Sequence, residues 1–114
     1  MSFKIHGAAH THTGRVRSNN EDNFYLEGRY RENVEQGEDT AVCRSDDRCF
    51  LAAVADGMGG EELGEEASLM AVQALKACTF QEIPSEAENA VRRGNDRICE
   101  EMERRGNRRM GSTL

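Results

Sequence analysis

The chain has 114 residues, of which 37% are hydrophobic and 32% charged, a composition typical of one folded domain that we predict to span residues 1–114. Its formal net charge of −6 at pH 7 disfavours nucleic acid and anionic membrane surfaces as partners, because both attract basic faces. The sequence has no secretory pattern and no apolar run long enough to span a membrane, so we expect a cytoplasmic protein.

The first half of the chain predicts β-strands. Apolar residues at 3–9 and the segment 23–28 predict the first two strands. Residues 31–39 carry no apolar periodicity, so we predict a solvated loop and assign it no function. Two further segments, residues 40–43 and 48–55, flank a Ser-Asp-Asp turn and predict a hairpin. Its second arm contains FLAAVA, which is apolar on both faces and predicts a central, buried strand.

Four cysteines, Cys43, Cys49, Cys78 and Cys99, include no Cys-x-x-Cys pair. Without a secretory signal, reduced thiols are the default and packing is their simplest role. A zinc site made from all four is disfavoured, because such sites usually bring their ligands in close pairs. A contact between Cys43 and Cys49 across the predicted hairpin stays open.

The second half of the chain predicts two helices. From Leu63 to Cys78 apolar residues recur at helical spacing, and acids that suit the helix dipole gather at the amino end: Glu61, Glu62, Glu65 and Glu66. After Pro84, a capping box at residues 85–88 begins a second helix that ends before Gly106. Both helices are amphipathic, so we expect each to cover the FLAAVA strand. Residues 110–114 predict the entry to another strand, where we expect the chain to be cut.

The stretch VADGMGG places Asp56 at the end of the most apolar segment, with three glycines following it. A rigid strand would hold this carboxylate, and glycines would let a metal ion, water or phosphate approach the main chain. Asp56 and the carbonyl of Gly57 could thus form half of a site for a hard divalent cation. A plain Asp-Gly turn is the alternative.

A second constellation lies in the polar turn at residues 14–24, which delivers Arg17, Glu21 and Asp22 just before a strand. The planar fork of arginine suits phosphate, whereas carboxylates and water suit magnesium or manganese. A solvated loop with surface ion pairs is the alternative.

Two other features suggest binding sites, but each also has a simpler interpretation. His10 and His12 would share one face of a strand, where His6 could join them in a zinc site, although solvated histidines are the simpler interpretation. The run RRGNRR at residues 104–109 could bind a phosphopeptide or nucleic acid, but arginines also favour a helix end. We favour the solvated interpretation for both.

Four motifs in order, TGRVRSNNEDNF, VADGMGG, GEEAS and MGSTL, resemble the amino-terminal part of the metal-dependent protein phosphatases of type 2C. The resemblance runs from about residue 11 to residue 114. It implies an α+β fold, a sandwich of two antiparallel sheets with helices on both outer faces (α-β-β-α layers), of which this chain would form the amino-terminal portion. It also implies a binuclear Mn²⁺ or Mg²⁺ centre that hydrolyses phosphoserine and phosphothreonine in proteins.

The same resemblance implies roles for individual residues. Asp56 would bridge both metals, Gly57 would offer its carbonyl, Glu21 would bind through metal-held water, Asp22 would support the site and Arg17 would hold the substrate phosphate. The mechanism would be in-line attack by a metal-activated water, without a covalent phosphoenzyme.

This chain departs from the family pattern at three points. The family's further metal-binding aspartates lie beyond the matching end of Leu114, so we expect the isolated chain to be inactive. Met58 stands where many members have a histidine proposed as general acid, so the proton for the leaving group would come from water. His12 stands where the family often has an acid. The alternative function is a non-catalytic fragment or pseudophosphatase that acts as an interaction module, associating through the exposed edge at its cut end.

Overall fold

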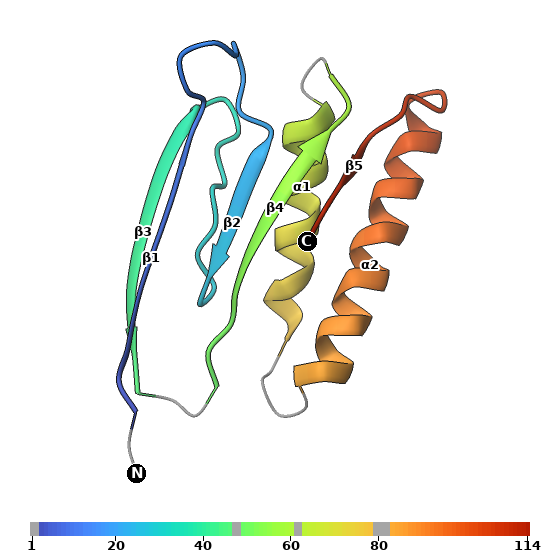
Figure 1. Ribbon diagram of the computed structural model, residues 1–114. Coiled ribbons are helices and arrows are strands. Elements are labelled where there is room, and N and C mark those ends of the chain that lie inside the picture. The colour runs from blue at the N-terminus through green and yellow to red at the C-terminus, as the bar shows by residue number, and fades with distance from the viewer. Residues whose placement is uncertain (1–2, 47–48, 61–62, 79–82) are drawn as a thin grey trace.

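The computed structural model describes residues 3–46, 49–60, 63–78 and 83–114. In chain order the elements are β1 (Ile5–His12), β2 (Asp22–Leu26), β3 (Glu38–Ser45), β4 (Ala52–Met58), α1 (Leu63–Ala74), the 3₁₀ turn η1 (Leu75–Ala77), α2 (Ile83–Arg104) and β5 (Gly111–Ser112). Strands therefore precede helices, as the sequence predicts, with one short strand at the end (Figure 1). None of the described helices is both long and apolar enough to cross a membrane.

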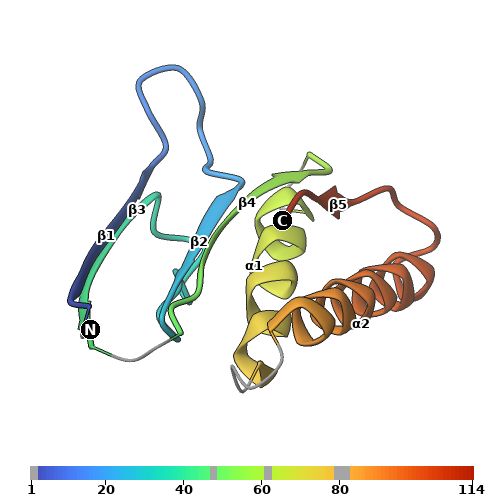
Figure 2. The ribbon, with the colours of Figure 1, turned by 60° about the horizontal axis from the view of Figure 1, so that its bottom comes forward.

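The strands form two antiparallel sheets that pack face to face. One pairs β1 with β3, and the other has the order β2-β4-β5. Phe24 and Leu26 of β2 pack against Ala41 of β3 in the layer between the sheets. Figure 2 shows the β1–β3 pair on one side of β2 and β4, with the helices on the other side. The architecture is α+β, an antiparallel sandwich flanked by helices, as predicted.

The predicted hairpin of residues 40–43 with residues 48–55 is wrong. β3 pairs along its whole length with β1, whereas β4 pairs with β2, so the chain crosses from one sheet to the other between them. The physical reason is apolar burial. In the observed pairing, the inner face of the β1–β3 pair covers apolar side chains of β2, which would stay exposed to water if β3 paired with β4 in one sheet. The predicted contact between Cys43 and Cys49 loses the hairpin on which it rested, and none of the four cysteines is in a disulfide.

β4 is central in its sheet, as predicted, but it is buried on one face only. Ala55 is completely buried beneath α1, while Val54, whose side chain points to the opposite face, is 72% exposed. Over the described residues the β1–β3 pair packs on β2 and leaves this face of β4 open. The apolar character of FLAAVA therefore identified a central strand without showing which face is covered.

Helix α1 covers β4 as expected, but the same expectation for α2 is wrong. Val72 of α1 packs with Ala55 in the main core, whereas α2 packs on α1. A Cβ atom at Gly94 of α2 would lie 3.3 Å from Cβ of Ala74, so the two helices approach closely at that glycine. Because α1 already occupies the face of β4, α2 lies beside α1 instead (Figure 2). Ile98 of α2 packs with Leu63 of α1 and with Met110.

The predicted ends of the helices are mostly confirmed. Helix α1 begins at Leu63, although Glu61 and Glu62 lie outside the described residues. Helix α2 begins two residues before the predicted cap at Ser85, with Pro84 in its first turn, where a missing N–H breaks no helical hydrogen bond. At the other end Gly106 has φ 73°, and its N–H donates to the carbonyl of Glu103, the geometry of a glycine cap.

The prediction of a solvated loop at residues 31–39 is wrong at both ends of the segment. Residues 32–36 are mostly exposed, but Arg31 is 1% exposed and is among the largest fully buried side chains of the described residues. β3 already begins at Glu38. The charge of Arg31 made the segment look hydrophilic, and sequence periodicity carries no sign of a buried, hydrogen-bonded arginine.

Candidate functional site

Two carboxylates face each other where β2 begins and β4 nears its end. The register of the two strands places Asp22 opposite Asp56. The N–H of Gly57 donates to the carbonyl of Glu21 at 3.1 Å, so the adjacent Asp22–Asp56 pair is a non-hydrogen-bonded pair, in which side chains approach most closely. Both side chains are exposed, on the face of the sheet that looks toward β1 and β3. The strand pairing thus brings two oxygen donors together at the open end of the sandwich.

The electrostatics of this pair disfavour the ionisation of both carboxyl groups at once. Partial burial raises the pKa of Asp22, the charge of Asp56 and a hydrogen bond with it raise the pKa further, and only the charge of Arg31 lowers it. Two like charges this close disfavour full ionisation. A proton or a cation between the two carboxylates would therefore relieve their repulsion.

Arg17, in the polar turn at residues 14–24, lies beside the two carboxylates. A cavity of about 240 Å³ is lined by Arg17, Glu21, Asp22, Asp56 and their neighbours His12, Thr13, Asn19 and Asn20. Arg17 is exposed, so its guanidinium is open to solvent. The fold therefore brings together the arginine and all three acids that the sequence singles out, from two segments that are more than thirty residues apart.

Gly57 and Gly64 bring the start of α1 onto this end of the sheet. A Cβ atom at Gly57 would lie 2.0 Å from the carbonyl oxygen of Gly64. A Cβ atom at Gly64 would in turn lie 2.5 Å from Oε1 of Glu21. The close approach that Gly57 permits is thus made by the helix main chain, and a metal-binding role for its carbonyl stays a prediction.

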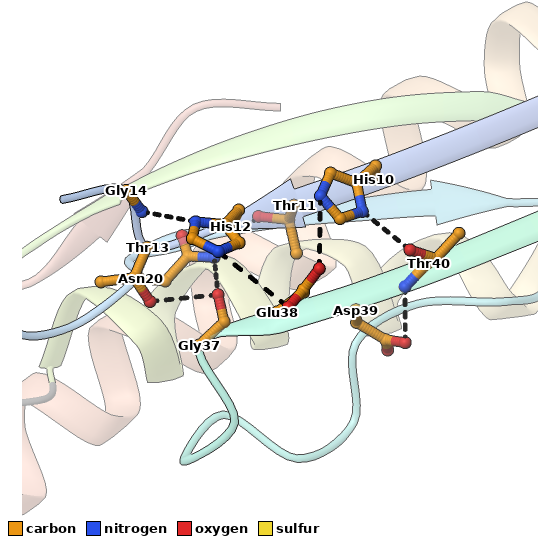
Figure 3. A network of polar contacts seen from close by, with 10 residues as sticks. All are labelled: His10, Thr11, His12, Thr13, Gly14, Asn20, Gly37, Glu38, Asp39 and Thr40. Carbon is orange, nitrogen blue, oxygen red and sulfur yellow. Dashed lines mark hydrogen bonds and ion pairs between the residues drawn. The ribbon is translucent and has the colours of Figure 1, made fainter.

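The loop that carries Arg17 is fixed at its base by a network of polar contacts (Figure 3). The side-chain amide of Asn20 donates to Oγ1 of Thr11 at 2.8 Å and to the carbonyl of Gly37 at 3.0 Å. The N–H of Thr13 donates to the same carbonyl at 2.8 Å. The N–H of Asp22 donates to Oδ1 of Asn20 at 3.0 Å, which joins the network to the carboxylate pair.

His12 belongs to this network, although it stands where an acid is expected. Its Nδ1 accepts the N–H of Gly14 at 2.8 Å, so the imidazole provides the acceptor that a carboxylate would provide in the same turn (Figure 3). The turn thus has an imidazole nitrogen as the acceptor of its hydrogen bond. This contact also assigns the proton of a neutral His12 ring to Nε2.

The histidines lie on one exposed face of β1, as predicted, but they do not form a zinc site. Nε2 of His10 and Nε2 of His12 lie 3.7 Å and 4.0 Å from the carboxylate of Glu38. The Nε2 proton of His12 faces that carboxylate, so this nitrogen offers no free lone pair to a metal. Within the described ranges no three His, Cys, Asp or Glu side chains are arranged to hold an ion.

The donor set of the carboxylate pair fits part of a divalent-cation site. Carboxylate oxygens are the ligands that Mg²⁺ prefers, usually one or two of them together with water and substrate phosphate. Asp22 and Asp56 supply two, while Glu21 turns its carboxylate toward Gly64. The described residues therefore provide half of a centre, and the ligation itself stays a prediction.

Arg31, which is not singled out in the sequence analysis, contacts the acidic turn, defined here as residues 20–22. Its guanidinium donates to the carbonyls of Asn20, Asp22 and Gln36, at 2.6, 2.9 and 2.8 Å. An isolated arginine in a polar run is normally solvated, so no local pattern distinguishes it.

The fold of the described residues is similar to part of a serine/threonine phosphatase of known structure. Among solved structures, the chain is similar to the serine/threonine phosphatase PstP/Ppp of Mycobacterium tuberculosis, with a TM-score of 0.67 and 29% sequence identity. The similarity covers 99% of this chain and 40% of the mycobacterial chain, and it confirms the resemblance predicted from the motifs. No protein-family model matches the sequence, and no curated protein matches it either.

Proposed function

We propose that this chain forms the amino-terminal part of the catalytic centre of a metal-dependent protein phosphatase, which hydrolyses phosphoserine and phosphothreonine with Mn²⁺ or Mg²⁺. The observation that carries the proposal is the pairing of Asp22 with Asp56 beside a cavity that Arg17 also lines. Anion-binding and cation-binding groups thus share one solvent-open site. Because the chain spans 40% of the length of the mycobacterial phosphatase, activity and substrates belong to the complete protein.

Each residue has a role that follows from its chemistry. Asp56 and Asp22 would hold divalent cations through carboxylate oxygens, and Glu21 would contribute through water. When bound, the ions supply a water of lowered pKa as the nucleophile. The planar fork of Arg17 binds two phosphoryl oxygens and neutralises charge that develops on them. Met58 cannot donate a proton, so the leaving group takes its proton from water.

The proposal is tested by phosphopeptide hydrolysis with Mn²⁺ in the complete protein that contains this chain. We expect Asp56→Asn to lower turnover by about 100-fold or more, because the variant loses a carboxylate that would hold the cations. Arg17→Ala should lower kcat/KM by a similar order through weaker use of the phosphate. Arg15→Ala is the matched control, since Arg15 is an exposed arginine of the same loop that does not line the cavity.

Two outcomes separate the proposal from its alternative. Unchanged turnover of the Asp56→Asn protein would remove the assigned centre. A complete protein that binds a partner but hydrolyses no phosphopeptide with either metal would favour the non-catalytic interaction module. A cytoplasmic location stays a prediction from the sequence.

A further inference from the structure

Arg31 is a buried charge that the proposed chemistry does not use. Its side chain is 1% exposed, and it follows the two-residue turn that ends β2. Burial of an arginine is costly unless its donors are matched and its charge is offset. The contacts of Arg31 therefore indicate what the burial achieves.

The guanidinium forms hydrogen bonds with the main chain on both sides of Glu21. Nη2 donates to the carbonyl of Asn20 at 2.6 Å and to the carbonyl of Asp22 at 2.9 Å. Nη1 donates to the carbonyl of Gln36 at 2.8 Å, which anchors the other end of the group. Two of these three hydrogen bonds fix the peptide groups that carry the acidic turn.

The arginine is itself held in place. Asn23, which is 1% exposed, accepts the N–H of Arg31 at 3.0 Å through Oδ1 and donates to its carbonyl at 2.9 Å through Nδ2. The negative charges that favour the ionised guanidinium are those of Glu65, Asp22 and Asp39. Glu65 is 3% exposed and comes from the first turn of α1, in the GEEAS motif. Contacts from β2 and the charge of Glu65 from α1 thus hold the guanidinium in the position from which it bonds the acidic turn.

We propose that Arg31 is a positioning residue, which clamps the main chain around Glu21 so that the carboxylate of Asp22 faces Asp56 and both can bind one divalent cation. This inference rests on the proposed function. A planar guanidinium suits the task because its rigid fork bonds two carbonyls in fixed directions, whereas the ammonium of lysine is a compact charge without that geometry. Arg31 holds the ligands through the backbone and touches no substrate, and Arg31→Lys keeps the positive charge that Arg31 places near Asp22.

The experiment compares the complete protein that contains this chain with its variant Arg31→Lys. The first readout is Mn²⁺ affinity by isothermal titration calorimetry. The second is the cross-strand NOE between the Hα atoms of Asp22 and Asp56, which reports a non-hydrogen-bonded antiparallel pair without any metal. We expect affinity to fall about 10- to 100-fold, the usual effect of losing a group that orients a metal ligand, and the NOE to weaken.

Two controls separate positioning from general stability. Arg29→Lys changes an exposed arginine on the same segment, whose Nη1 donates to the carbonyl of Val42 at 3.1 Å and not to the acidic turn. Val72→Ala removes volume from a fully buried core position under the sheet and should lower the unfolding temperature. Both folded controls should keep wild-type Mn²⁺ affinity and the NOE.

The outcomes are distinct. A folded Arg31→Lys variant that keeps the wild-type Mn²⁺ affinity and the NOE overturns the inference. This holds even if its melting temperature falls, because Val72→Ala should show the same loss of stability without any change at the site. Should Arg31→Lys not fold, Arg31→Gln, which buries no charge, takes its place under the same criteria. A complete wild-type protein that binds no Mn²⁺ would count against the proposed function, while the NOE comparison would still decide the role of Arg31.

Discussion

At the scale of single residues, the site depends on two aspartates that repel each other. Asp22 and Asp56 come from strands that pair in one register, and a slip by one residue would turn one carboxylate to the opposite face of the sheet. The glycine contacts oppose such a slip, because Gly57 and Gly64 fit around the main chain and side chain of Glu21 without room for a Cβ atom. The fold therefore holds together two charges that would separate in a flexible loop.

His12 gives a prediction at the same scale. His12→Ala removes the acceptor of the Gly14 N–H, whereas His12→Asp offers a carboxylate in the same place. We expect the alanine variant to lower the local opening free energy at Gly14 by about 1 kcal/mol, visible as faster amide hydrogen exchange, and the aspartate variant to restore protection. His10→Ala is the control, since His10 contacts Thr40 and Glu38 rather than the loop. Equal exchange at Gly14 in His12→Ala and wild type would contradict the assignment.

At the scale of elements, a network of ion pairs ties the end of α2 to the start of α1. Arg105, which follows the last residue of α2, bonds both Glu66 of α1 and Glu101 of α2, and Arg104 bonds Glu101 through Nε at 2.9 Å. These contacts support the interpretation of the arginine run as a helix end rather than a binding site, since its first two members are already paired. The network thus adds a polar connection to the apolar contacts between α2 and α1.

Acid should weaken this connection between the helices. The hydrogen bonds from Arg104 and Arg105 lower the pKa of Glu101 from 4.5 to about 2. A carboxyl with a depressed folded-state pKa stabilises fully above its unfolded value and loses that contribution as the pH falls through the folded value, here between about 4.5 and about 2. We therefore expect Glu101→Gln to lower the unfolding temperature at neutral pH and to flatten its decline across this window, measured by circular dichroism.

Glu100→Gln is the control for that measurement. Glu100 is exposed, and the structure shows it no ion pair within the part of the chain it describes. Its variant should follow the wild-type profile. Parallel profiles for Glu101→Gln and wild type would mean that the network contributes nothing to the folded state.

At the scale of the whole molecule, the sandwich is open on one side. Val54 and Met58 are 72% and 68% exposed on the face of β4 that looks toward the other sheet, and Asp56 lies between them. The proposed cation site therefore stands at the mouth of an uncovered apolar surface. Of the predicted sandwich, the described residues supply one helical side and the beginnings of both sheets.

A cation that binds only the folded chain should stabilise the whole molecule. At Mn²⁺ concentrations about a hundredfold above the dissociation constant, linkage predicts a gain of about 2.7 kcal/mol in the free energy of unfolding. Thermal unfolding with increasing Mn²⁺, reversed by a chelator, measures the gain. Asp56→Asn should lose most of it, and an equal gain in that variant would place the binding elsewhere.

Much of the fold and of the candidate site could be predicted from the sequence, because local signals encode it. The amino end of α1 and the glycine cap of α2 at Gly106 are local, since each depends on a few consecutive residues. The central position of β4 followed from its apolar run. Arg17, Glu21, Asp22 and Asp56 were found from their motifs, which name residue types but not distances.

Only the tertiary structure decided which surfaces meet. The pairing of β3 with β1, the docking of α2 on α1 and the burial of Arg31 each depend on contacts between distant parts of the chain. No local pattern encodes them, because an amphipathic face or a charged side chain is satisfied equally by several partners, and the global packing selects one. The residue types of the site thus belong to the sequence, whereas the register that sets Asp22 against Asp56 belongs to the fold.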